Sequence, residues 1–375
     1  MRSFISSKLS EQDALLVLNA INGFGIKRIR QLIERFGSAA QALCESMDIF
    51  INYPGIPQAS RALIPHFNVK DFLKKDHQAC QRFGARVVTF MDEDYPASLL
   101  QISDPPAVLY VSGAWPQRLD CGVAIVGSRR ASLYGLQIAQ RFAAQLAELG
   151  VPIISGLARG VDGAAHQGAL LAGGSTVAVL GCGLDVIYPP EHALLYRQIK
   201  AQGCLVSEFA FGTQPLPYNF PRRNRIVSGL SLGVVVVEAN IKSGALVTAG
   251  LALEQGREVF AVPGRIDSDV SDGPHALIKQ GAKPVLSIQD ILEELPVEIV
   301  QAPAKDDGKT SQALVQGLSN DQRLVFGFIK EGHMTYEALE CATGFGPTVL
   351  LDALLALELQ EKIVQKPGKM FVLKG

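Results

Sequence analysis

The chain has 375 residues, 48% of them hydrophobic and 19% charged, and this composition excludes a disordered polypeptide. The formal net charge of −1 excludes a globally basic nucleic-acid binder, so any such site must be a local patch. Single cores seldom grow past roughly 250 to 300 residues, and we therefore expect more than one domain.

Residues 11–43 have the pattern of two helices around a glycine turn. Apolar residues recur at helical spacing on both sides of Asn-Gly-Phe-Gly at residues 22–25. Helix-hairpin-helix modules use such a turn to hold a DNA phosphate. Lys27 and Arg28 follow the turn at a helix start, where anions are favoured. A packing module without a ligand is the alternative. We assign residues 1–84 to an N-terminal helical domain of helix-hairpin-helix or SAM-like type.

Between residues 85 and 295 the pattern changes to short β-branched runs that alternate with glycine loops and helical stretches. This alternation predicts an α/β domain with a parallel sheet and crossover helices. We expect strands near residues 87–90, 123–126, 153–155, 177–180, 205–207, 234–237 and 259–262. We expect helices near residues 136–149, 164–171, 194–201 and 245–255.

The loops that follow these strands carry the unusual residues. Because parallel strands end at one edge of a sheet, these loops should meet there. They contain Gly127-Ser128-Arg129-Arg130, Gly156-Leu157-Ala158-Arg159-Gly160, Gly181-Cys182-Gly183, Glu208, the stretch from Glu238 to Gly244, and Pro263-Gly264-Arg265. Bare glycine backbone and helix N-termini at such an edge favour anions, so the predicted ligand is anionic.

One segment, Phe-Pro-Arg-Arg-Asn-Arg, places Arg222, Arg223 and Arg225 within four residues. The Phe-Pro pair before these arginines and the apolar segment after them indicate a loop on a fixed scaffold. Guanidinium groups held this way can grip phosphate oxygens in a bidentate fork. As an alternative, Arg223 or Arg225 braces Glu208 or Glu238.

An acid/base site is a second interpretation of the same region. Asp162 and His166 stand four residues apart and could be joined by Glu208 and Glu238. The competing interpretation is structural, because Asp162 near a helix start can cap that helix and glutamates at strand ends commonly accept backbone N–H bonds.

Several cofactor and targeting patterns are absent from the sequence. No Gly-x-Gly-x-x-Gly opens a helix and no Gly-x-x-x-x-Gly-Lys-Ser/Thr occurs, which argues against dinucleotide and ATP sites. Six scattered cysteines show no metal-binding spacing. The N-terminus has no signal-peptide pattern, and no apolar run approaches the roughly 20 residues of a membrane span. We expect a cytoplasmic protein without a cofactor, a metal or a membrane contact.

The last part of the chain indicates a small separate domain. Residues 296–312 are polar and weakly patterned, as in a linker. Residues 313–375 have the order of three helices and a β-hairpin, which is the order of a winged helix. The helix near residues 347–359, which would read duplex DNA, has no arginine or lysine. We therefore expect a protein-interaction or weak DNA role there.

A series of ordered motifs resembles the DprA/Smf family, the DNA-processing protein A family. The motifs are Ile-Val-Gly-Ser-Arg-Arg, Ser-Gly-Leu-Ala-Arg-Gly-Val-Asp-Gly-Ala-Ala-His, Ala-Val-Leu-Gly-Cys-Gly-Leu-Asp, Tyr-Pro, Ser-Glu, Phe-Pro-Arg-Arg-Asn-Arg-Ile-Val-Ser-Gly-Leu-Ser, Lys-Ser-Gly-Ala-Leu-Val-Thr-Ala, Gly-Arg-Glu-Val-Phe-Ala-Val-Pro-Gly and Leu-Ile-Lys-Gln-Gly-Ala. The resemblance implies an extended Rossmann-like domain and a homodimer. It also implies a non-enzymatic protein that binds single-stranded DNA during natural transformation and loads a RecA-type recombinase onto it.

Carried over by matching motif, the resemblance implies a DNA-binding pocket. Its residues are Gly127, Ser128, Arg129, Arg159, Phe220, Arg222, Arg223, Asn224, Arg225, Lys242, Ser243 and Gly244. The cations would follow the backbone, while the N–H groups of Gly127 and Gly244 would bind phosphate oxygens. Phe220 would stack on a base, an interaction worth about 1–3 kcal/mol. As an alternative, Phe220 is a core plug beneath the arginines.

The chain departs from the family pattern at two positions, where His192 and His275 replace asparagine. These histidines put only the hydrogen bonding of two loops in doubt and would add a pH dependence if either lay near DNA. Two rival functions remain open. The first is a nucleotide enzyme of the phosphoribohydrolase type, although the glutamate this chemistry needs is missing after Thr248. The second is a protein adaptor that does not bind DNA.

Overall fold

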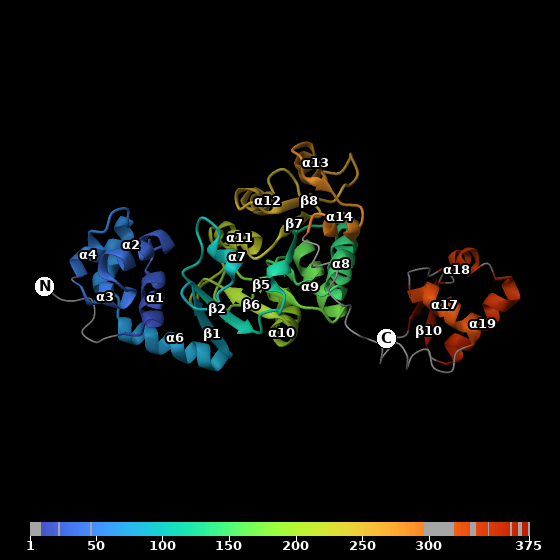
Figure 1. Ribbon diagram of the computed structural model, residues 1–375, viewed down its shortest axis with the longest axis horizontal. Coiled ribbons are helices and arrows are strands. Elements are labelled where there is room, and N and C mark those ends of the chain that lie inside the picture. The colour runs from blue at the N-terminus through green and yellow to red at the C-terminus, as the bar shows by residue number, and fades with distance from the viewer. Residues whose placement is uncertain are drawn as a thin grey trace. The chain divides into compact units, whose positions relative to one another are not determined.

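The computed structural model describes residues 9–21, 23–45, 47–295, 319–330, 335–343, 345–360, 362–366 and 370–373. These residues belong to two compact units, one within residues 1–303 and one within residues 304–375 (Figure 1). Within the described ranges, no helix has the length and apolar character needed to cross a lipid bilayer.

The first unit begins with a group of short helices. They are α1 (Glu11–Ala20), α2 (Ile26–Phe36), α3 (Ala39–Cys44), α4 (Met47–Ile51), α5 (Gln58–Leu63), η1 (Ile64–His66) and α6 (Val69–Phe83). Helices α1 and α2 flank the glycine turn as the spacing predicts, although Asn22 lies outside the described residues. The Glu11 carboxylate accepts the N–H groups of Ala39 and Ala40 at 2.6 and 3.0 Å. This contact ties the start of α3 to the start of α1, since a carboxylate suits a helix N-terminus.

A nine-stranded sheet forms the centre of the first unit. Its strands are β1 (Ala85–Thr89), β2 (Val108–Gly113), β3 (Val123–Val126), β4 (Ile153–Ser155), β5 (Thr176–Val179), β6 (Cys204–Ser207), β7 (Gly233–Val236), β8 (Glu258–Ala261) and β9 (Lys283–Pro284). The order across the sheet is β1-β2-β6-β5-β4-β3-β7-β8-β9. The seven strands predicted from the sequence are confirmed within a few residues, but β2 and β9 were not predicted.

The expectation of a purely parallel sheet is wrong at one edge. Strand β2 runs antiparallel to both β1 and β6, while β6, β5, β4, β3, β7, β8 and β9 are mutually parallel. The connection from β1 to β2 contains only the short helix α7 (Ala97–Leu100). Parallel pairing usually uses a crossover helix that packs back along the sheet, and this connection has none of that length, so the chain returns in the opposite direction.

Helices cover both faces of the sheet (Figure 1). Helices α8 (Leu133–Glu148), α9 (Val161–Leu171) and α10 (Ala193–Gln202) lie on one face, together with α14 (Ile288–Leu292). Helices α11 (Asn219–Gly229), α12 (Gly244–Glu254) and α13 (Asp272–Lys279) lie on the other face with α7. Alternate residues of β3 show this division, because Val123 and Ile125 pack towards α8 while Ala124 and Val126 pack towards α12. The central strands are therefore buried on both sides.

The strand order contains one reversal. From β3 the chain builds outwards through β4, β5 and β6, and it then returns to place β7 on the other side of β3. The loops after β3 and β7 consequently lead away in opposite directions. Open α/β sheets bind ligands in the crevice that such a reversal leaves at the carboxyl ends of the strands.

The second unit consists of α17 (Asn320–Lys330), α18 (Tyr336–Thr343), α19 (Pro347–Leu359) and the antiparallel strands β10 (Ile363–Lys366) and β11 (Met370–Leu373). Val325, Ile329, Leu350, Leu354 and Leu357 form its core. The described elements follow the order that the sequence predicts.

Asp76 on α6 is the basis of a first prediction. Its carboxylate is 4% exposed and accepts the Tyr110 hydroxyl at 3.0 Å, while the second oxygen has no partner among the described residues. Burial raises the pKa of Asp76 although the Tyr110 hydrogen bond opposes the rise. Since the folded pKa exceeds the unfolded value, folding takes up a proton and stability falls as the pH rises through this window.

We therefore expect the stability of Asp76→Asn, relative to the wild type, to increase from pH 4 to pH 8. Urea unfolding at several pH values measures this difference. Asp71→Asn, at an exposed site on the same helix, is the control and should show no such gain. A difference for Asp76→Asn that does not change with pH would contradict the buried charge.

Candidate functional site

A cavity of about 850 Å³ lies at the reversal point of the sheet. Its walls come from the loops after β3, β4 and β7, from α11 and from the first turn of α12. The structure brings nine of the twelve predicted site residues together here: Gly127, Ser128, Arg129, Phe220, Arg223, Asn224, Lys242, Ser243 and Gly244. Arg159, Arg222 and Arg225 do not line the cavity.

The arginine segment is a helix, so the prediction of a loop from the sequence is wrong. Residues Asn219–Gly229 form α11, so the three arginines lie in its first two turns. Pro221 stands in the first turn, where a missing N–H breaks no helical hydrogen bond. On a helix, the three arginine side chains do not all point in the same direction from the axis. Arg222 and Arg225, three residues apart, share one side of the helix, while Arg223 points elsewhere.

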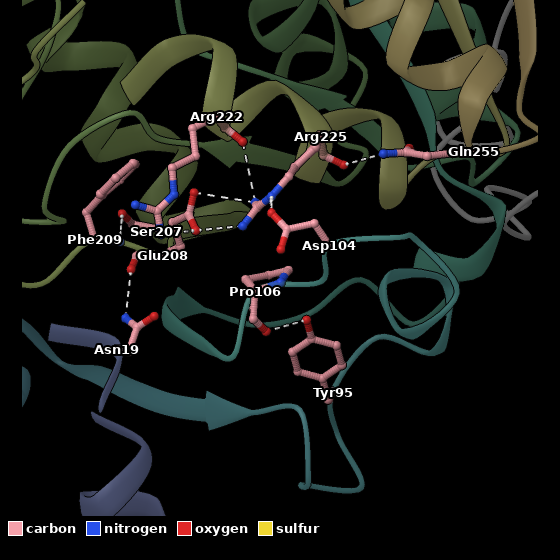
Figure 2. Close-up of polar contacts among 10 residues, drawn as sticks. All are labelled: Asn19, Tyr95, Asp104, Pro106, Ser207, Glu208, Phe209, Arg222, Arg225 and Gln255. Carbon is pink, nitrogen blue, oxygen red and sulfur yellow. Dashed lines mark hydrogen bonds and ion pairs between the residues drawn. The ribbon is translucent and has the colours of Figure 1, made fainter. Parts of the chain in front are cut away.

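Arg222 and Arg225 both bind Glu208, which follows β6 and is 2% exposed. Figure 2 shows the two guanidinium groups beside the Glu208 carboxylate, with Asp104 next to Arg225. Nη2 of Arg225 and Nη2 of Arg222 lie 2.8 and 3.0 Å from Oε2 of Glu208, and Nε of Arg225 lies 3.0 Å from Oδ2 of Asp104. Burial opposes the charge of Arg225, but the two carboxylates outweigh it, so the pKa of Arg225 lies above its ordinary value.

This network settles the two interpretations given for Arg225. The guanidinium group of Arg225 is buried and braces Glu208, which was the alternative considered from the sequence. Arg222 differs because its side chain is 48% exposed and only its Nη2 atom is bonded to Glu208. Arg225 therefore fixes α11 on the sheet, while Arg222 keeps donors at the surface.

Arg223 is a buried cation in the cavity wall. Its Nη1 donates to the Gly156 carbonyl at 2.6 Å and also to the carbonyl of Val179. Burial lowers the pKa of Arg223 to about 10, although Asp162 opposes the shift. Asp162 in turn accepts the Gly156 N–H at 3.1 Å and the Ala158 N–H. Arg223 thus braces the loop after β4, and neither Glu208 nor Glu238 as the sequence alternative proposed.

Phe220 combines the two roles that the sequence left open. One part of its ring packs on Gly181, where an added Cβ would come within 2.9 Å of the ring. The Tyr188 ring lies 5.5 Å away between centroids. The Arg129 guanidinium lies over the ring at 5.1 Å from its centroid. Phe220 therefore packs against Gly181 on one side, and the Arg129 cation covers its ring at the cavity surface.

Polar groups suited to an anion face the same cavity. Lys242 is exposed and its ammonium has no bonded partner among the described residues. Ser243 caps α12 by accepting the Ala245 N–H, and the N-terminus of this helix opens on the cavity at Gly244. Gly127 is required by packing, since a Cβ there would lie 2.8 Å from the Glu238 carbonyl. The arrangement can bind phosphate oxygens.

The remaining predicted residue, Arg159, lies outside the cavity. It forms an exposed ion pair with Glu191. The two histidines that depart from the family pattern each contact a backbone carbonyl. Nδ1 of His192 lies 3.2 Å from the Leu157 carbonyl, and Nε2 of His275 lies 3.1 Å from the Gly264 carbonyl.

The four groups considered for an acid/base site have separate structural contacts. Glu238 accepts the Ser132 N–H at 2.8 Å and thereby fixes the start of α8, while Glu208 binds the arginines. His166 is buried with Nδ1 2.7 Å from the Thr176 hydroxyl, and burial lowers its pKa to about 3. The described residues contain no group of three His, Cys, Asp or Glu side chains able to hold a metal ion.

Some cavity residues were not assigned from the sequence. Tyr188, Asn240 and Asp269 line the cavity as well. Asn240 lies in the stretch from Glu238 to Gly244 and Tyr188 in the Tyr-Pro motif, but neither was assigned a ligand role, and Asp269 carried no signal.

Comparisons with known proteins point to one family. A family model described as DNA recombination-mediator protein A matches residues 86–296. The chain is 54% identical to Protein Smf of Escherichia coli (strain K12) over 204 residues, which are 54% of this chain and 54% of that protein. The chain therefore spans about half the length of this relative.

Two solved structures are similar over most of their own length. An X-ray structure of DNA processing protein A from Streptococcus pneumoniae is 36% identical with a TM-score of 0.66, covering 77% of this chain and 99% of that chain. DNA processing protein A from Helicobacter pylori, described with a single-stranded DNA binding mode, is 32% identical with a TM-score of 0.52. That match covers 57% of this chain and 98% of the other.

The Glu208 network gives a second prediction. Arg225→Leu removes one partner of a buried pair, and we expect the free energy of unfolding to fall by about 3–5 kcal/mol. The double variant Glu208→Leu with Arg225→Leu should recover much of this loss, because no buried charge is left uncompensated. Urea denaturation measures all three proteins.

The exposed pair of Arg159 with Glu191 supplies the control. Arg159→Leu should leave the free energy of unfolding nearly unchanged, since surface ion pairs contribute little. A double variant as unstable as Arg225→Leu alone would contradict the view that the loss comes from a Glu208 carboxylate left with Arg222 as its remaining partner among the described residues.

Proposed function

Because the chain belongs to the DNA recombination-mediator protein A family, we propose that it binds single-stranded DNA in the cavity at the carboxyl edge of its sheet. One observation carries the proposal: exposed cations, a helix N-terminus and an aromatic ring face a single cavity at the reversal point. The similar Helicobacter pylori protein, described with a single-stranded DNA binding mode, supports it.

Each residue of the cavity has a distinct proposed role. Arg129 and Lys242 contact phosphates in the cavity, and Arg222 continues the positive surface along α11. The α12 N-terminus at Gly244 and the hydroxyl groups of Ser128 and Ser243 provide further donors. Asn224 offers an amide on the same wall. Arg223 and Arg225 position α11 and do not contact the strand.

Base contact is proposed to be independent of sequence. Phe220 presents an aromatic ring at the cavity surface, and every base has a π-face that can stack on it. The Arg129 guanidinium that lies over the ring would give up this face to the base and could then contact the neighbouring phosphate. A platform of this kind holds strands of any sequence.

The wider role follows the family resemblance. We propose that the protein is a cytoplasmic, non-enzymatic homodimer that protects incoming single strands and loads a RecA-type recombinase onto them during natural transformation. The proposed domains are residues 1–84, of helix-hairpin-helix or SAM-like type, residues 85–295, with an extended Rossmann-like fold, and residues 313–375, a winged helix. Residues 296–312 are the proposed linker.

Removing the two exposed cations of the cavity tests the proposal. Arg129→Ala with Lys242→Ala should weaken single-strand binding and flatten its dependence on salt by about 0.7 logarithmic units per lost phosphate contact. Fluorescence anisotropy of a labelled oligonucleotide at several salt concentrations measures both effects.

The matched control is Arg159→Ala with Arg265→Ala, which removes the same charge from exposed pairs outside the cavity. This control should keep the wild-type affinity and salt slope. An unchanged salt slope in the cavity variant would show that Arg129 and Lys242 do not belong to the site. In a separate assay, release of free base from a nucleotide would favour the alternative of a phosphoribohydrolase-type enzyme.

Substitution of Phe220 tests stacking separately from charge. Phe220→Leu keeps an apolar contact on Gly181 but removes the aromatic face, and it should weaken binding by about 1–3 kcal/mol per stacked base. Phe220→Tyr should retain the wild-type affinity. The same anisotropy assay with strands that contain an abasic site distinguishes stacking from packing.

The wild-type protein should bind abasic strands more weakly than intact strands, and this difference should be smaller in Phe220→Leu. An equal difference in both proteins would show that Phe220 only fills space.

A further inference from the structure

A second cavity, of about 810 Å³, lies among the N-terminal helices. Its walls are one face of α2 along its whole length, the chain from Ile49 to Pro54, and Asp104 from the loop before β2. Three of its lining side chains, Lys27, Arg28 and Arg35, are cations. Cations are concentrated on α2, whose sequence Ile-Lys-Arg-Ile-Arg-Gln-Leu-Ile-Glu-Arg-Phe contains four of them and one acid, whereas the whole chain carries −1.

The three cations of this cavity do not have the same function. Arg28 donates to the backbone carbonyls of Gly23, Pro54 and Gly55, so it joins the glycine turn to the chain that follows α4. Lys27 is exposed and has no hydrogen-bond or ion-pair partner in the part of the chain that the structure describes. The exposed Arg35 guanidinium lies 5.0 Å from the ring centroid of its neighbour Phe36 and has no hydrogen-bond or ion-pair partner among the described residues. Arg28 therefore shapes the cavity, and Lys27 with Arg35 are available to a ligand.

The available groups form a stripe along the helix. Lys27, Gln31 and Arg35 follow one another at intervals of four residues, which places them on one face of α2. At 1.5 Å per residue the stripe is about 12 Å long. Gln31 lies between the cations and accepts the Tyr53 hydroxyl at 3.1 Å. Two cations at this separation suit repeated phosphates better than one small anion.

The single acid in the cavity wall is already neutralised. Asp104 accepts Nε of Arg225 at 3.0 Å, so its charge is paired with a cation of α11 (Figure 2). This pair also joins the two cavities, because α11 supplies Phe220, Arg223 and Asn224 to the first cavity. Asn19 of α1 adds a second link by donating to the Glu208 carbonyl at 3.3 Å. The half-exposed Arg222 belongs to the same network.

We propose that the second cavity binds the phosphodiester backbone of the same single strand that occupies the first cavity. The strand leaves the sheet edge, passes α11 at Arg222 and continues along Lys27, Gln31 and Arg35. The N-terminal helices then lengthen the binding site without adding base contacts. This inference rests on the function proposed above.

Strand length separates the two sites experimentally. Short oligothymidylates of about 6 nucleotides fill one site, while strands of about 30 nucleotides reach both. We expect Lys27→Ala with Arg35→Ala to bind the short strand as the wild type does. The same variant should bind the long strand about 10-fold more weakly, with a salt slope lower by about 0.7 per lost contact.

Helix α6 supplies a matched control. Lys70→Ala with Lys74→Ala likewise removes two exposed cations of one helix face, from the same group of helices but outside the cavity. This variant should bind both strands like the wild type. Equal long-strand losses in the two variants would overturn the proposal, because the effect would then come from net charge alone.

Three other results would also overturn the proposal. They are wild-type affinity of the cavity variant for the long strand, an equal loss for the short strand, and a loss confined to duplex DNA, which would make the second cavity a duplex site. Failure of the function itself gives a different result, since the wild-type protein would then bind neither strand.

Discussion

A buried carboxylate, Glu208 at the end of β6, sets the position of α11. A charge in such a site requires partners, and both guanidinium partners come from this helix. Their spacing of three residues fixes the rotation of α11 about its axis. Phe220, Arg223 and Asn224 are thereby turned towards the reversal point of the sheet. The composition of the cavity wall thus depends on an ion pair that lies outside it.

The sequence predicted the sheet better than it predicted the cations. Strands covered on both faces are continuous apolar runs, and this pattern located seven of them. Strand β2 and its antiparallel direction were not predicted, because its connection to β1 contains only the four-residue helix α7 and shows no clear alternation of strand and helix. The start of α11 was missed because a proline such as Pro221 usually indicates a helix break, although proline is tolerated in the first turn of a helix. The roles of the three arginines could not be distinguished from the sequence, because they depend on the direction and the burial that the helix gives each side chain.

Charge is distributed locally in this molecule. A chain with a formal charge of −1 has one helix, α2, with four cations and one acid, and a cavity where Arg129 and Lys242 face solvent. Buried cations such as Arg223 and Arg225 add to the count of arginines but bind protein atoms. The total charge therefore does not indicate where an anion would bind. The contacts of each guanidinium group are a better guide, because they show which cations already bind protein atoms.

The contact between Arg129 and Phe220 has a kinetic consequence. With a cation resting on its face, the ring is already occupied, so in the proposed function a base would have to exchange with this internal competitor. Exchange of this kind limits how long each nucleotide stays, because the departing base is replaced at once by the side chain. On the proposed function, a strand held through such contacts would be released one nucleotide at a time.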